Sequence, residues 1–509
     1  MDDHVDLATV DGPDRCGELR QILLNNRKLI IASNRGPVTF HTDAEGQVQP
    51  QRGGGGLVTA LAGLAQHVEA CWIAAAQTPE DRAWSKGEMP LGDDGHSIQV
   101  QFVAPDAAAY EGYYTVIANP LLWFLQHAMW DIFRAPTIDR TTWLHWENGY
   151  VAVNKLFAEA ISQQIRAAGR PALVMLQDYH LYLAPGFIRH ALRARASYTL
   201  MHFIHIPWPG AEDWGLLPSK MRRAILEGLC AVDVLGFQTR EDAMNFLRTC
   251  ESFLPGAYVK FKYGRIWFRN HMTHVRDFPI SIDVRGVKLL AESQEVKEYF
   301  AQLRERHGGQ PLIVRVDRME PSKNIVRGFR AFDEMLDVYP EHRGKVKLLA
   351  MAVPSRLEVE AYQTYVDEMM GAAGRVNAKH GSSDWEPVRV LVGENYPRAI
   401  AALQLYDVLL VNSIADGMNL VAKEGPIVNL RNGVLVLSER TGAYQQLAPG
   451  ALVIPPLDIY ATAEALHQAL IMPAEERRQR AERLRQLIER DDIVSWLCQQ
   501  FDAISALGL

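Results

Sequence analysis

The chain has 509 residues, of which 48% are hydrophobic and 22% charged, and its formal net charge is -7 at pH 7. This length predicts two domains rather than a single core, and the composition excludes disordered and fibrous proteins. The acidic balance argues against a general nucleic-acid-binding protein, so we expect no nucleic acid partner, although a local basic pocket is compatible with it.

The N-terminal segment and the cysteines indicate a compartment. Residues 1–27 form a predicted arm that is acidic and polar where a secretion signal would be basic and then apolar. No apolar stretch reaches the roughly 20 residues that a membrane-spanning helix needs. The cysteines lack the spacing of a zinc site or a disulfide framework, and we expect idle thiols at Cys16, Cys71, Cys230, Cys250 and Cys498. We therefore predict a cytoplasmic protein with no membrane partner.

Short β-branched segments alternate with longer amphipathic segments from residue 28 to about residue 455. This alternation is typical of parallel sheets with crossover helices. Strands are predicted in the first half at 28–34, 71–76, 97–104, 171–178, 198–207 and 232–239. Strands are predicted in the second half at 311–318, 345–354, 388–394, 407–413, 433–439 and 451–456. We predict an α/β protein with two doubly wound sheets of about six strands each.

A change of pattern marks the predicted domain boundary. One series of strands ends near residues 277–287, where a charged, helix-rich stretch begins. We expect a first domain over 28–282 and a second over 283–485. After Pro456 the chain is expected to be mostly helical, and the charged run at 473–492 is more typical of a solvated helix than of a recognition element.

Two features follow the first predicted strand: the sequence SNRGP at 33–37 and a run of four glycines at 53–56. Glycines before a helix that begins near Leu57 suit a loop that closes over a phosphate or a sugar. The run is neither a P-loop nor a G-x-G-x-x-G motif. By itself it fits a plain flexible loop equally well.

Asp178 and His205 each end a predicted strand of the first half. Because the carboxyl ends of parallel strands share one edge of a sheet, we expect both side chains to face the same cleft. A carboxylate can hold an acceptor hydroxyl, and a histidine can bond a sugar oxygen or carry a proton. A lone histidine would more often be a satisfied core residue, but two such residues on neighbouring strands favour a site.

Arg318 and Lys323 follow the strand at 311–318, across a turn that contains Pro321. Both can converge on one diphosphate, the arginine through its planar fork and the lysine as a point charge. The alternative is an ordinary pair of surface cations. Their position after a buried strand favours a functional role.

The segment from Asp416 to Glu424 follows the strand at 407–413. Gly417 permits close approach of the backbone, and the next amides lie near a helix N-terminus. Asp416 could hold hydroxyls and Glu424 a ribose, while phosphate oxygens could accept from the amides of Met418, Asn419 and Leu420. An N-cap explains Asp416 alone equally well, but it does not explain the whole segment.

Together these groups predict a transferase that acts on a nucleotide-activated sugar. The sequence has no D-x-D after an apolar strand, no H-E-x-x-H and no Cys/His cluster, so we predict no metal site. Arg318, Lys323 and helix dipoles would then neutralise the diphosphate. No cofactor is expected, since the nucleotide sugar is a substrate.

Several segments, in this order, resemble those of the trehalose-6-phosphate synthase family, retaining glycosyltransferases of the GT-B fold. The resemblance spans roughly residues 28 to 500 and is carried by SNRGPV, GGGGLVTAL, YYTVIANPLLW, QDYHLYLAP, FIHIPWP, LGFQT, FPISID, VDRMEPSKN, PSRLEVEAYQ, DGMNLVAKE and GVLVLSERTGA. It implies two facing Rossmann-like domains with the active site in the cleft between them. It also implies that a final helix, over 486–509, rejoins the first domain.

The resemblance implies a role for each matched residue. Catalysis would rest on Asp178, His205, Arg318 and Lys323. The donor would be bound by Gly56, Arg318, Lys323, Asp416, Met418, Asn419, Leu420 and Glu424, and Tyr396 could stack on its base. The acceptor would be bound by Arg35, Tyr114, Trp123, Asp178 and Arg356. The family uses no covalent enzyme intermediate, which agrees with the absence of an obvious nucleophile.

Two segments depart from the family pattern. Many members have Trp-x-Gly-Trp, whose second tryptophan lines the acceptor phosphate pocket, whereas this chain has CWIAAAQT, with Trp72 followed by alanines. The segment VDRMEPSKNIVRG departs from the commoner DYSKG form, with Asn324 where a glycine is usual. The acceptor could therefore differ in detail.

The leading hypothesis is transfer of glucose from GDP- or UDP-glucose to glucose 6-phosphate, giving trehalose 6-phosphate. One alternative is a pseudo-glycosyltransferase of the validoxylamine A 7′-phosphate synthase type, which couples a GDP-activated cyclitol to an aminocyclitol 7-phosphate. An alternative of another class is a catalytically silent regulator that binds sugar phosphates. The expected partners are the nucleotide sugar and a phosphorylated sugar or cyclitol; a homo-oligomer is compatible with the sequence.

Overall fold

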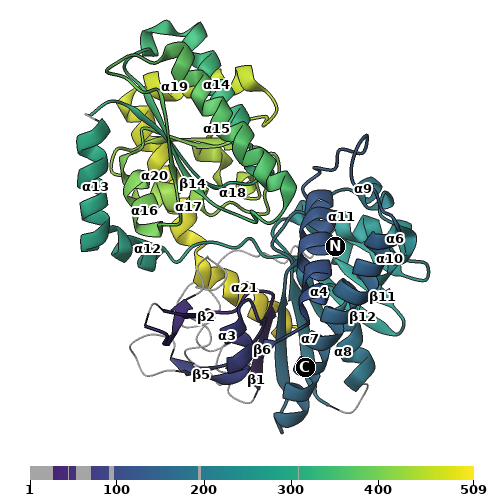
Figure 1. Cartoon of the computed structure of the whole chain (residues 1–509). Coiled ribbons are helices and arrows are strands. Elements are labelled where there is room, and N and C mark those ends of the chain that lie inside the picture. The colour runs from purple at the N-terminus through teal and green to yellow at the C-terminus, as the bar shows by residue number, and fades with distance from the viewer. Residues whose placement is uncertain are drawn as a thin grey trace.

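The computed structural model describes residues 27–43, 45–52, 70–90, 97–192, 196–307 and 309–508. Two sheets organise these residues, one built from strands between residues 28 and 277 and the other from strands between residues 312 and 454 (Figure 1). The predicted arm, apart from Arg27, and the glycine run with Gly56 lie outside the described residues. The role predicted for Gly56 stays a prediction.

The first sheet has ten strands in the order β10-β11-β12-β9-β8-β7-β1-β4-β6-β5. Its parallel centre contains the six predicted strands: β1 (Lys28–Ser33), β4 (Ala70–Ala75), β6 (Ser97–Val103), β7 (Ala172–Gln177), β8 (Tyr198–Phe203) and β9 (Val234–Phe237). The sequence missed four further strands at its edges: β5 (Lys86–Pro90), β10 (Tyr258–Lys260), β11 (Arg265–Phe268) and β12 (His271–Asp277). Strand β11 alternates exposed and buried residues, and β12 has only two buried residues among polar, partly buried ones. Both therefore lack the continuous apolar run used to find the other strands.

Alternate residues of the central strands pack on opposite faces of this sheet. Ile30 and Ala32 of β1 join the core beneath the main group of helices, whereas Leu29 and Ile31 pack toward the other face. The longer helices of this part are α7 (Ala152–Ala167), α8 (Ala184–Leu192), α10 (Ser219–Leu229) and α11 (Arg240–Phe253). The shorter ones are α3 (Pro79–Trp84), α4 (Ala107–Tyr110), α5 (Phe124–Gln126), α6 (Arg140–His145), α9 (Ala211–Gly215), η3 (Tyr179–Leu181) and η4 (Phe261–Tyr263). A hairpin joins β2 (Val38–Thr42) to β3 (Val48–Arg52).

Two segments of this part form π-helices, η1 (Glu111–Trp123) and η2 (Trp146–Val151). π-Helical turns are rare and often mark functional positions. The first carries two of the predicted acceptor residues, Tyr114 and Trp123, and both are buried.

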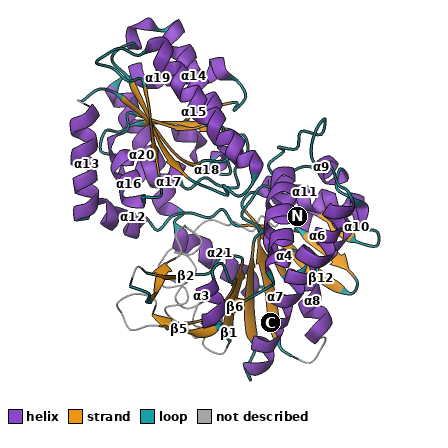
Figure 2. Cartoon of the chain, viewed as in Figure 1, coloured by secondary structure: helices purple, strands orange, loops and turns teal. Residues whose placement is uncertain are grey.

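The second sheet has six parallel strands in the order β15-β14-β13-β16-β17-β18. All six were predicted: β13 (Leu312–Arg318), β14 (Lys347–Val353), β15 (Val388–Val392), β16 (Val408–Val411), β17 (Val434–Ser438) and β18 (Leu452–Ile454). Helices α14 (Ile325–Val338), α15 (Glu360–His380) and α19 (Ile459–Ile471) cover one face (Figure 2). The other face is covered by α16 (Tyr396–Leu405), α17 (Val421–Val428) and α20 (Ala474–Arg490). The sheet is therefore doubly wound, as predicted.

The remaining elements of this half are α12 (Val284–Ala291), α13 (Gln294–His307), α18 (Tyr444–Leu447), η5 (Pro321–Lys323), η6 (Pro340–His342) and η7 (Ala448–Gly450). The last helix, α21 (Ile493–Ser505), returns to the first sheet (Figure 1). Its Trp496 Nε1 donates to the Phe278 carbonyl at 3.1 Å, and the Trp496 ring packs edge-on against Phe203. The helix predicted over 486–509 is in fact two helices, because α20 continues to Arg490 and Asp492 caps α21.

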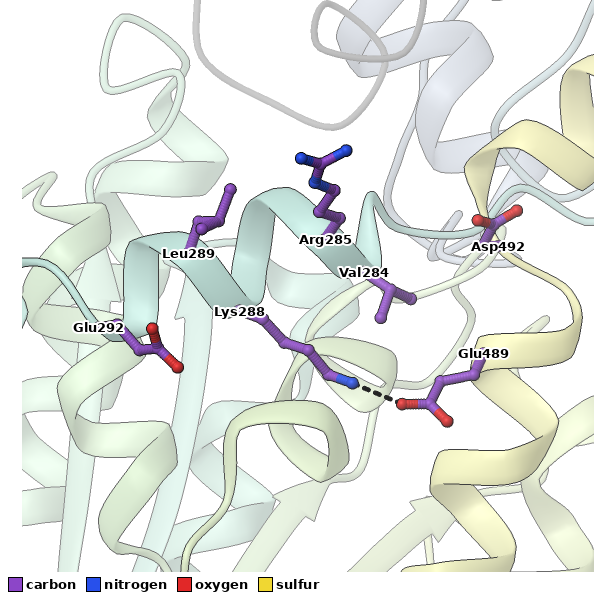
Figure 3. Close-up of a pocket in the computed structure, with 7 residues that line it drawn as sticks. All are labelled: Val284, Arg285, Lys288, Leu289, Glu292, Glu489 and Asp492. Atoms are coloured by element: carbon purple, nitrogen blue, oxygen red, sulfur yellow. Dashed lines mark hydrogen bonds and ion pairs between the residues drawn. The ribbon is translucent and has the colours of Figure 1, made fainter.

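The chain passes between the two halves twice, and the two passages contact each other. The Ile493 amide donates to the Ile282 carbonyl at 3.1 Å. Beside them lies a shallow depression of about 410 Å³, where Lys288 of α12 pairs with Glu489 of α20 at 2.6 Å (Figure 3). We propose that the two sheets mark two domains divided near residues 282 and 283; this boundary stays a prediction.

Among the helices of the described ranges, none is long and apolar enough to cross a bilayer. Cys71, Cys230 and Cys250 are buried thiols, as expected. Cys498 is disulfide-bonded, so the expectation of an idle thiol is wrong at that position.

Candidate active site

A buried carboxylate organises the cations that follow β13. Glu320 is 1% exposed; it accepts from Arg356 Nη1 at 3.1 Å and from Ser355 Oγ at 2.9 Å, and it lies 3.2 Å from Arg318 Nε. Burial alone would raise the pKa of Glu320, but the charges of Arg318 and Arg356 lower it to about 2. The Arg318 side chain remains 53% exposed and can face a ligand. Glu320 therefore fixes both guanidinium groups while one stays open.

Lys323 and Asp416 form a second charged group at the same edge. The Lys323 ammonium donates to Asp416 Oδ2, which also accepts from Asn419 Nδ2 at 3.1 Å and from Ser413 Oγ at 3.3 Å. Although burial acts to raise the pKa of Asp416, Lys323 holds it below its usual value. The ends of the neighbouring strands β13 and β16 thus bring Lys323 and Asp416 together, and Asp416 stays ionised.

The loop after Asp416 runs against the first half of the protein. A side chain on Gly417 would clash with the backbone oxygen of His205, so only glycine permits this approach. Asn419 has a left-handed backbone conformation (φ 74°), and its Oδ1 accepts from the Ala422 amide in the first turn of α17 at 3.1 Å. Across the described ranges, no hydrogen bond engages the amides of Met418, Asn419 or Leu420. These donors point to an anion site at the N-terminus of α17.

Tyr396 and Glu424 form a pair beyond this loop. The Tyr396 hydroxyl donates to Glu424 Oε1 at 2.9 Å, and burial raises the pKa of Glu424. The Tyr396 residue is 45% exposed, so part of its ring is open to a planar ligand. The hydrogen bond places Tyr396 and Glu424 side by side, as expected if one stacks on the base of a nucleoside and the other binds its ribose.

In the first half, Asp178 lies directly after β7. Its backbone is left-handed (φ 70°), and its Oδ1 accepts from the His205 amide at 3.2 Å. Burial raises the pKa of Asp178 to about 6, against the lowering effect of that amide. The expectation that Asp178 and His205 end neighbouring strands at one edge is met.

Two glutamines hold the His205 ring. Gln238 Oε1 accepts from the Ile280 amide at 2.9 Å, which directs Gln238 Nε2 toward His205 Nδ1, 3.4 Å away. The ring proton then lies on Nε2, which donates to Gln177 Oε1 at 2.9 Å. Burial lowers the pKa of His205 to about 3. A neutral ring with both nitrogens hydrogen-bonded is suited to orienting a ligand and is poorly suited to transferring a proton.

The predicted acceptor residues meet around His180. Its ring lies between Tyr179 (3.9 Å between centroids) and Tyr114 (5.8 Å, 11° between planes). Burial, then Arg356 and Arg35, lower the pKa of His180 well below its ordinary value. Its Nε2 is buried, with no hydrogen-bond partner in the described part of the chain. The cluster has an excess of donors and suits an anion.

Arg356 links the two halves of the site. Its Nη2 donates to Tyr179 Oη at 3.2 Å, and its guanidinium lies over Trp123, 5.1 Å from the ring centroid. Arg35 lies beside Tyr114, which raises the pKa of the guanidinium against the effect of desolvation. Trp123 is 2% exposed and therefore supports Arg356 from the core.

Sequence reasoning missed Glu320 and His180. Each lies two residues from a predicted site residue, Glu320 after Arg318 and His180 after Asp178. Position near a strand end was the available signal for both residues, and it was not applied to either of them.

Two other side-chain groups have geometry suited to a metal ion, Glu341 with His342 and His467, and Asp333 with Asp337 and His380. Neither contains a predicted site residue. In the second, Lys379 donates to both carboxylates, so a cation already occupies that position. The absence of a metal from the predicted active site stays a prediction.

Comparisons with known proteins identify the family of this chain. The model of glycosyltransferase family 20 matches residues 27–506. The bifunctional trehalose-6-phosphate synthase/phosphatase of Thermoproteus tenax is 33% identical over 482 residues, covering 92% of this chain but only 62% of that relative's length. The UDP-forming alpha,alpha-trehalose-phosphate synthase of Schizosaccharomyces pombe is 33% identical over 479 residues, covering 92% of this chain and 88% of the relative.

The fold has solved counterparts too. The structure described as "Trehalose-6-phosphate from E. coli bound with UDP-2-fluoro glucose" matches with a TM-score of 0.81 and 28% identity, covering 94% of this chain and 98% of that one. This likeness confirms the predicted GT-B fold with two Rossmann-like halves. The chain belongs to glycosyltransferase family 20.

Proposed function

We propose that the protein transfers glucose from UDP-glucose to glucose 6-phosphate, giving trehalose 6-phosphate with retention at the transferred anomeric carbon. The name of the S. pombe relative includes UDP formation, and the E. coli structure contains a UDP sugar. Both favour uridine over guanosine as the donor base.

The charged edge of the second sheet would bind the donor. Arg318 is partly exposed beside Glu320, and Lys323 is held by Asp416. As the bond from the anomeric carbon to the diphosphate breaks, negative charge grows on the leaving oxygens. Fixed cations and the free amides at the start of α17 stabilise that charge without rearranging. Tyr396 and Glu424 would hold the nucleoside.

The edge of the first sheet would bind the acceptor. Arg35, Arg356 and Tyr114 would hold the phosphate, with the buried His180 nitrogen among them. The ionised carboxylate of Asp178 would accept a hydrogen bond from a hydroxyl group of the acceptor sugar. The acceptor oxygen then bonds to the anomeric carbon on the face that the diphosphate leaves, and its proton passes to a leaving phosphate oxygen. His205 would orient the donor sugar through its neutral ring or its backbone oxygen.

The observation that carries this proposal is the Glu320 cluster. A buried, ionised carboxylate that holds Arg318 and reaches Arg356 joins the proposed diphosphate and acceptor sites. A protein that only binds one sugar phosphate would not need a carboxylate that joins two anion sites. The Glu320 cluster therefore weighs against the catalytically silent regulator. The cyclitol-coupling alternative uses the same scaffold and finds no support in the names of the relatives. A cytoplasmic location stays a prediction from the composition of the first residues.

The test is an incubation of the purified chain with UDP-glucose or GDP-glucose and glucose 6-phosphate. Nucleotide release is followed by an enzyme-coupled assay, and the product by ¹H and ³¹P NMR. We expect UDP and α,α-trehalose 6-phosphate in equal amounts. Release of neither nucleotide with any glucose donor would contradict the proposal and favour the cyclitol alternative.

A further inference from the structure

A buried lysine lies where the second half of the protein meets the passage between the halves. Lys423, in the first turn of α17, is 1% exposed, and its Nζ donates to the Ile280 carbonyl at 2.8 Å. Among the described residues, this carbonyl is the only hydrogen-bond acceptor that the ammonium has. An ammonium can donate three hydrogen bonds, so Lys423 is poorly satisfied for a buried charge.

The charge of Lys423 is costly to bury at this position. Burial lowers its pKa to about 7, and the nearby Asp491 opposes that effect only in part. Asp491 itself pairs with Arg490 at 2.6 Å and accepts from Gln446 Nε2 at 3.2 Å. A buried lysine without a carboxylate of its own contributes little to stability, which indicates a role in function.

The residue that Lys423 binds is held from its other side by the first half of the protein. The Ile280 amide donates to Gln238 Oε1 at 2.9 Å, and Gln238 Nε2 lies 3.4 Å from Nδ1 of His205. Gln238 directly follows β9 and is 2% exposed. A continuous series of contacts therefore runs from His205 through Gln238 and Ile280 to Lys423.

At its other end this series reaches the proposed donor site. Successive residues of a helix project about 100° apart, so Lys423 and Glu424 face different neighbours. Glu424 bonds to the tyrosine of the proposed nucleoside site, while Lys423 reaches Ile280. Gly417, before α17, lies against the backbone oxygen of His205. The loop and helix that carry the proposed donor groups thus meet the first half at Gly417 and at Lys423.

We propose that Lys423 is a positioning residue for glycosyl transfer: through the Ile280 carbonyl it holds α17, with Glu424 and the free amides before it, in register with His205 across the domain boundary. This inference rests on the proposed function for the roles of Glu424 and His205, but not for the contact that sets their relative position. Since Lys423 contacts the passage rather than the proposed donor groups, its loss should disturb the alignment of the two halves and leave donor affinity intact.

The test compares Lys423→Met and Gln238→Leu with the unchanged protein. Methionine keeps most of the lysine stem and removes a buried charge, so Lys423→Met should melt at or above the wild-type temperature. We expect its kcat to fall about tenfold, the effect of one hydrogen bond to a charged group, while the dissociation constant for UDP, measured by calorimetry, stays unchanged. Lys28→Met is the matched control, since Lys28 is also buried and donates to Gln164 Oε1 at 2.9 Å, at the amino end of β1. A lower melting temperature or weaker UDP binding in Lys423→Met would overturn the inference.

The double variant tests whether the two residues act through Ile280. Once Gln238 is absent, Lys423 has no route to His205, so the double variant should be no more than about twofold slower than Gln238→Leu alone. Losses in kcat that multiply to about a hundredfold would show that the two residues act independently, which contradicts the inference.

Hydrogen exchange separates this inference from the proposed function. Exchange at Ile280, followed by mass spectrometry of peptides that span residues 278–283, should be about tenfold faster in Lys423→Met and in Gln238→Leu than in Lys28→Met. That result supports the inference even if wild type releases no nucleotide from any glucose donor. Unchanged exchange in Lys423→Met would overturn it whether or not the transferase is active.

Discussion

The two halves of the candidate site differ in how their charged side chains are paired. At the edge of the second sheet the charges already pair with one another, Arg318 with Glu320 and Lys323 with Asp416. At the edge of the first sheet, the buried Nε2 of His180 has no hydrogen-bond partner in the described chain. A site that must stabilise a growing charge gains from fixed partners, because rearrangement during the reaction costs energy. A site that must select a ligand gains from buried polar groups whose hydrogen bonds are made only by the correct ligand.

Electrostatics follows the same division. Glu320 compensates Arg318 and Arg356, and its pKa falls to about 2 in consequence. Around His180, Arg35 and Arg356 act together with burial to keep the ring neutral. We therefore expect the proposed donor half to be prepared before substrate arrives, and the proposed acceptor half to be completed by its phosphate.

The prepared half can be broken most directly at Arg318. Arg318→Ala removes a cation that is half exposed, so we expect the fold to persist while kcat falls about 100-fold to 1000-fold. Steady-state kinetics with UDP-glucose and a thermal melt measure the two effects. Arg343→Ala, which removes a comparably exposed arginine paired with Asp337, is the control. Activity close to wild type in Arg318→Ala would refute the diphosphate role.

Glu320→Gln tests the compensation itself. Removing the buried anion leaves two guanidinium groups without their shared partner, so we expect a loss of stability on the order of 3 kcal/mol, together with a lower kcat. Chemical denaturation measures the first and initial rates the second. Glu358→Gln, at an exposed residue nearby, should change neither. If both variants unfold alike, Glu320 is not the organising anion.

Asp178 provides a test of the first half through pH. Since burial raises its pKa to about 6, the native protein holds a proton that the unfolded chain releases near pH 4. Its contribution to stability is thus present below pH 4 and is lost as pH rises to 6. Asp178→Asn should therefore melt higher than wild type at pH 7.5, and the difference should shrink toward pH 4.

The same ionisation governs acceptor use. We expect kcat/KM for glucose 6-phosphate in wild type to fall below about pH 6, where Asp178 becomes protonated. Asp178→Asn should have low activity at every pH and lack that acidic limb. An exposed control, Asp384→Asn, should reproduce the wild-type profile. If kcat/KM of Asp178→Asn still falls below about pH 6, the group that titrates is not Asp178.

The smallest effect is expected at Tyr396. Tyr396→Ala removes a ring that is 45% exposed and should raise KM for UDP-glucose about threefold to tenfold, whereas Tyr396→Phe should retain most of the affinity. Tyr460→Ala, at a similarly exposed tyrosine of α19, is the control. Equal losses in Tyr396→Phe and Tyr396→Ala would move the role from the ring to the bond with Glu424.

The central strands could be predicted from the sequence because each is a short, largely apolar segment, and several are followed by a charged residue. Strand β7 is buried throughout and is followed by Asp178, and strand β13 begins with three buried apolar residues and ends at Arg318. Parallel topology brings both strand ends to the sheet edges. Edge strands such as β11 escaped because half of their residues face solvent. The predicted start of the last helix, at residue 486, was wrong. The helical backbone of α20 ends at Arg490, and a new helix begins at Ile493 after the N-cap Asp492. The contact of Arg356 with Tyr179 joins residues 177 positions apart, which no local pattern connects.

A crystal structure of wild-type protein with UDP and glucose 6-phosphate tests the central claim most directly. We predict that the diphosphate lies between Arg318 and Lys323, with the amides at the start of α17 around it, and that the acceptor phosphate lies between Arg35 and Arg356. A diphosphate bound away from Arg318 and Lys323, or held chiefly by a metal ion, would contradict the account.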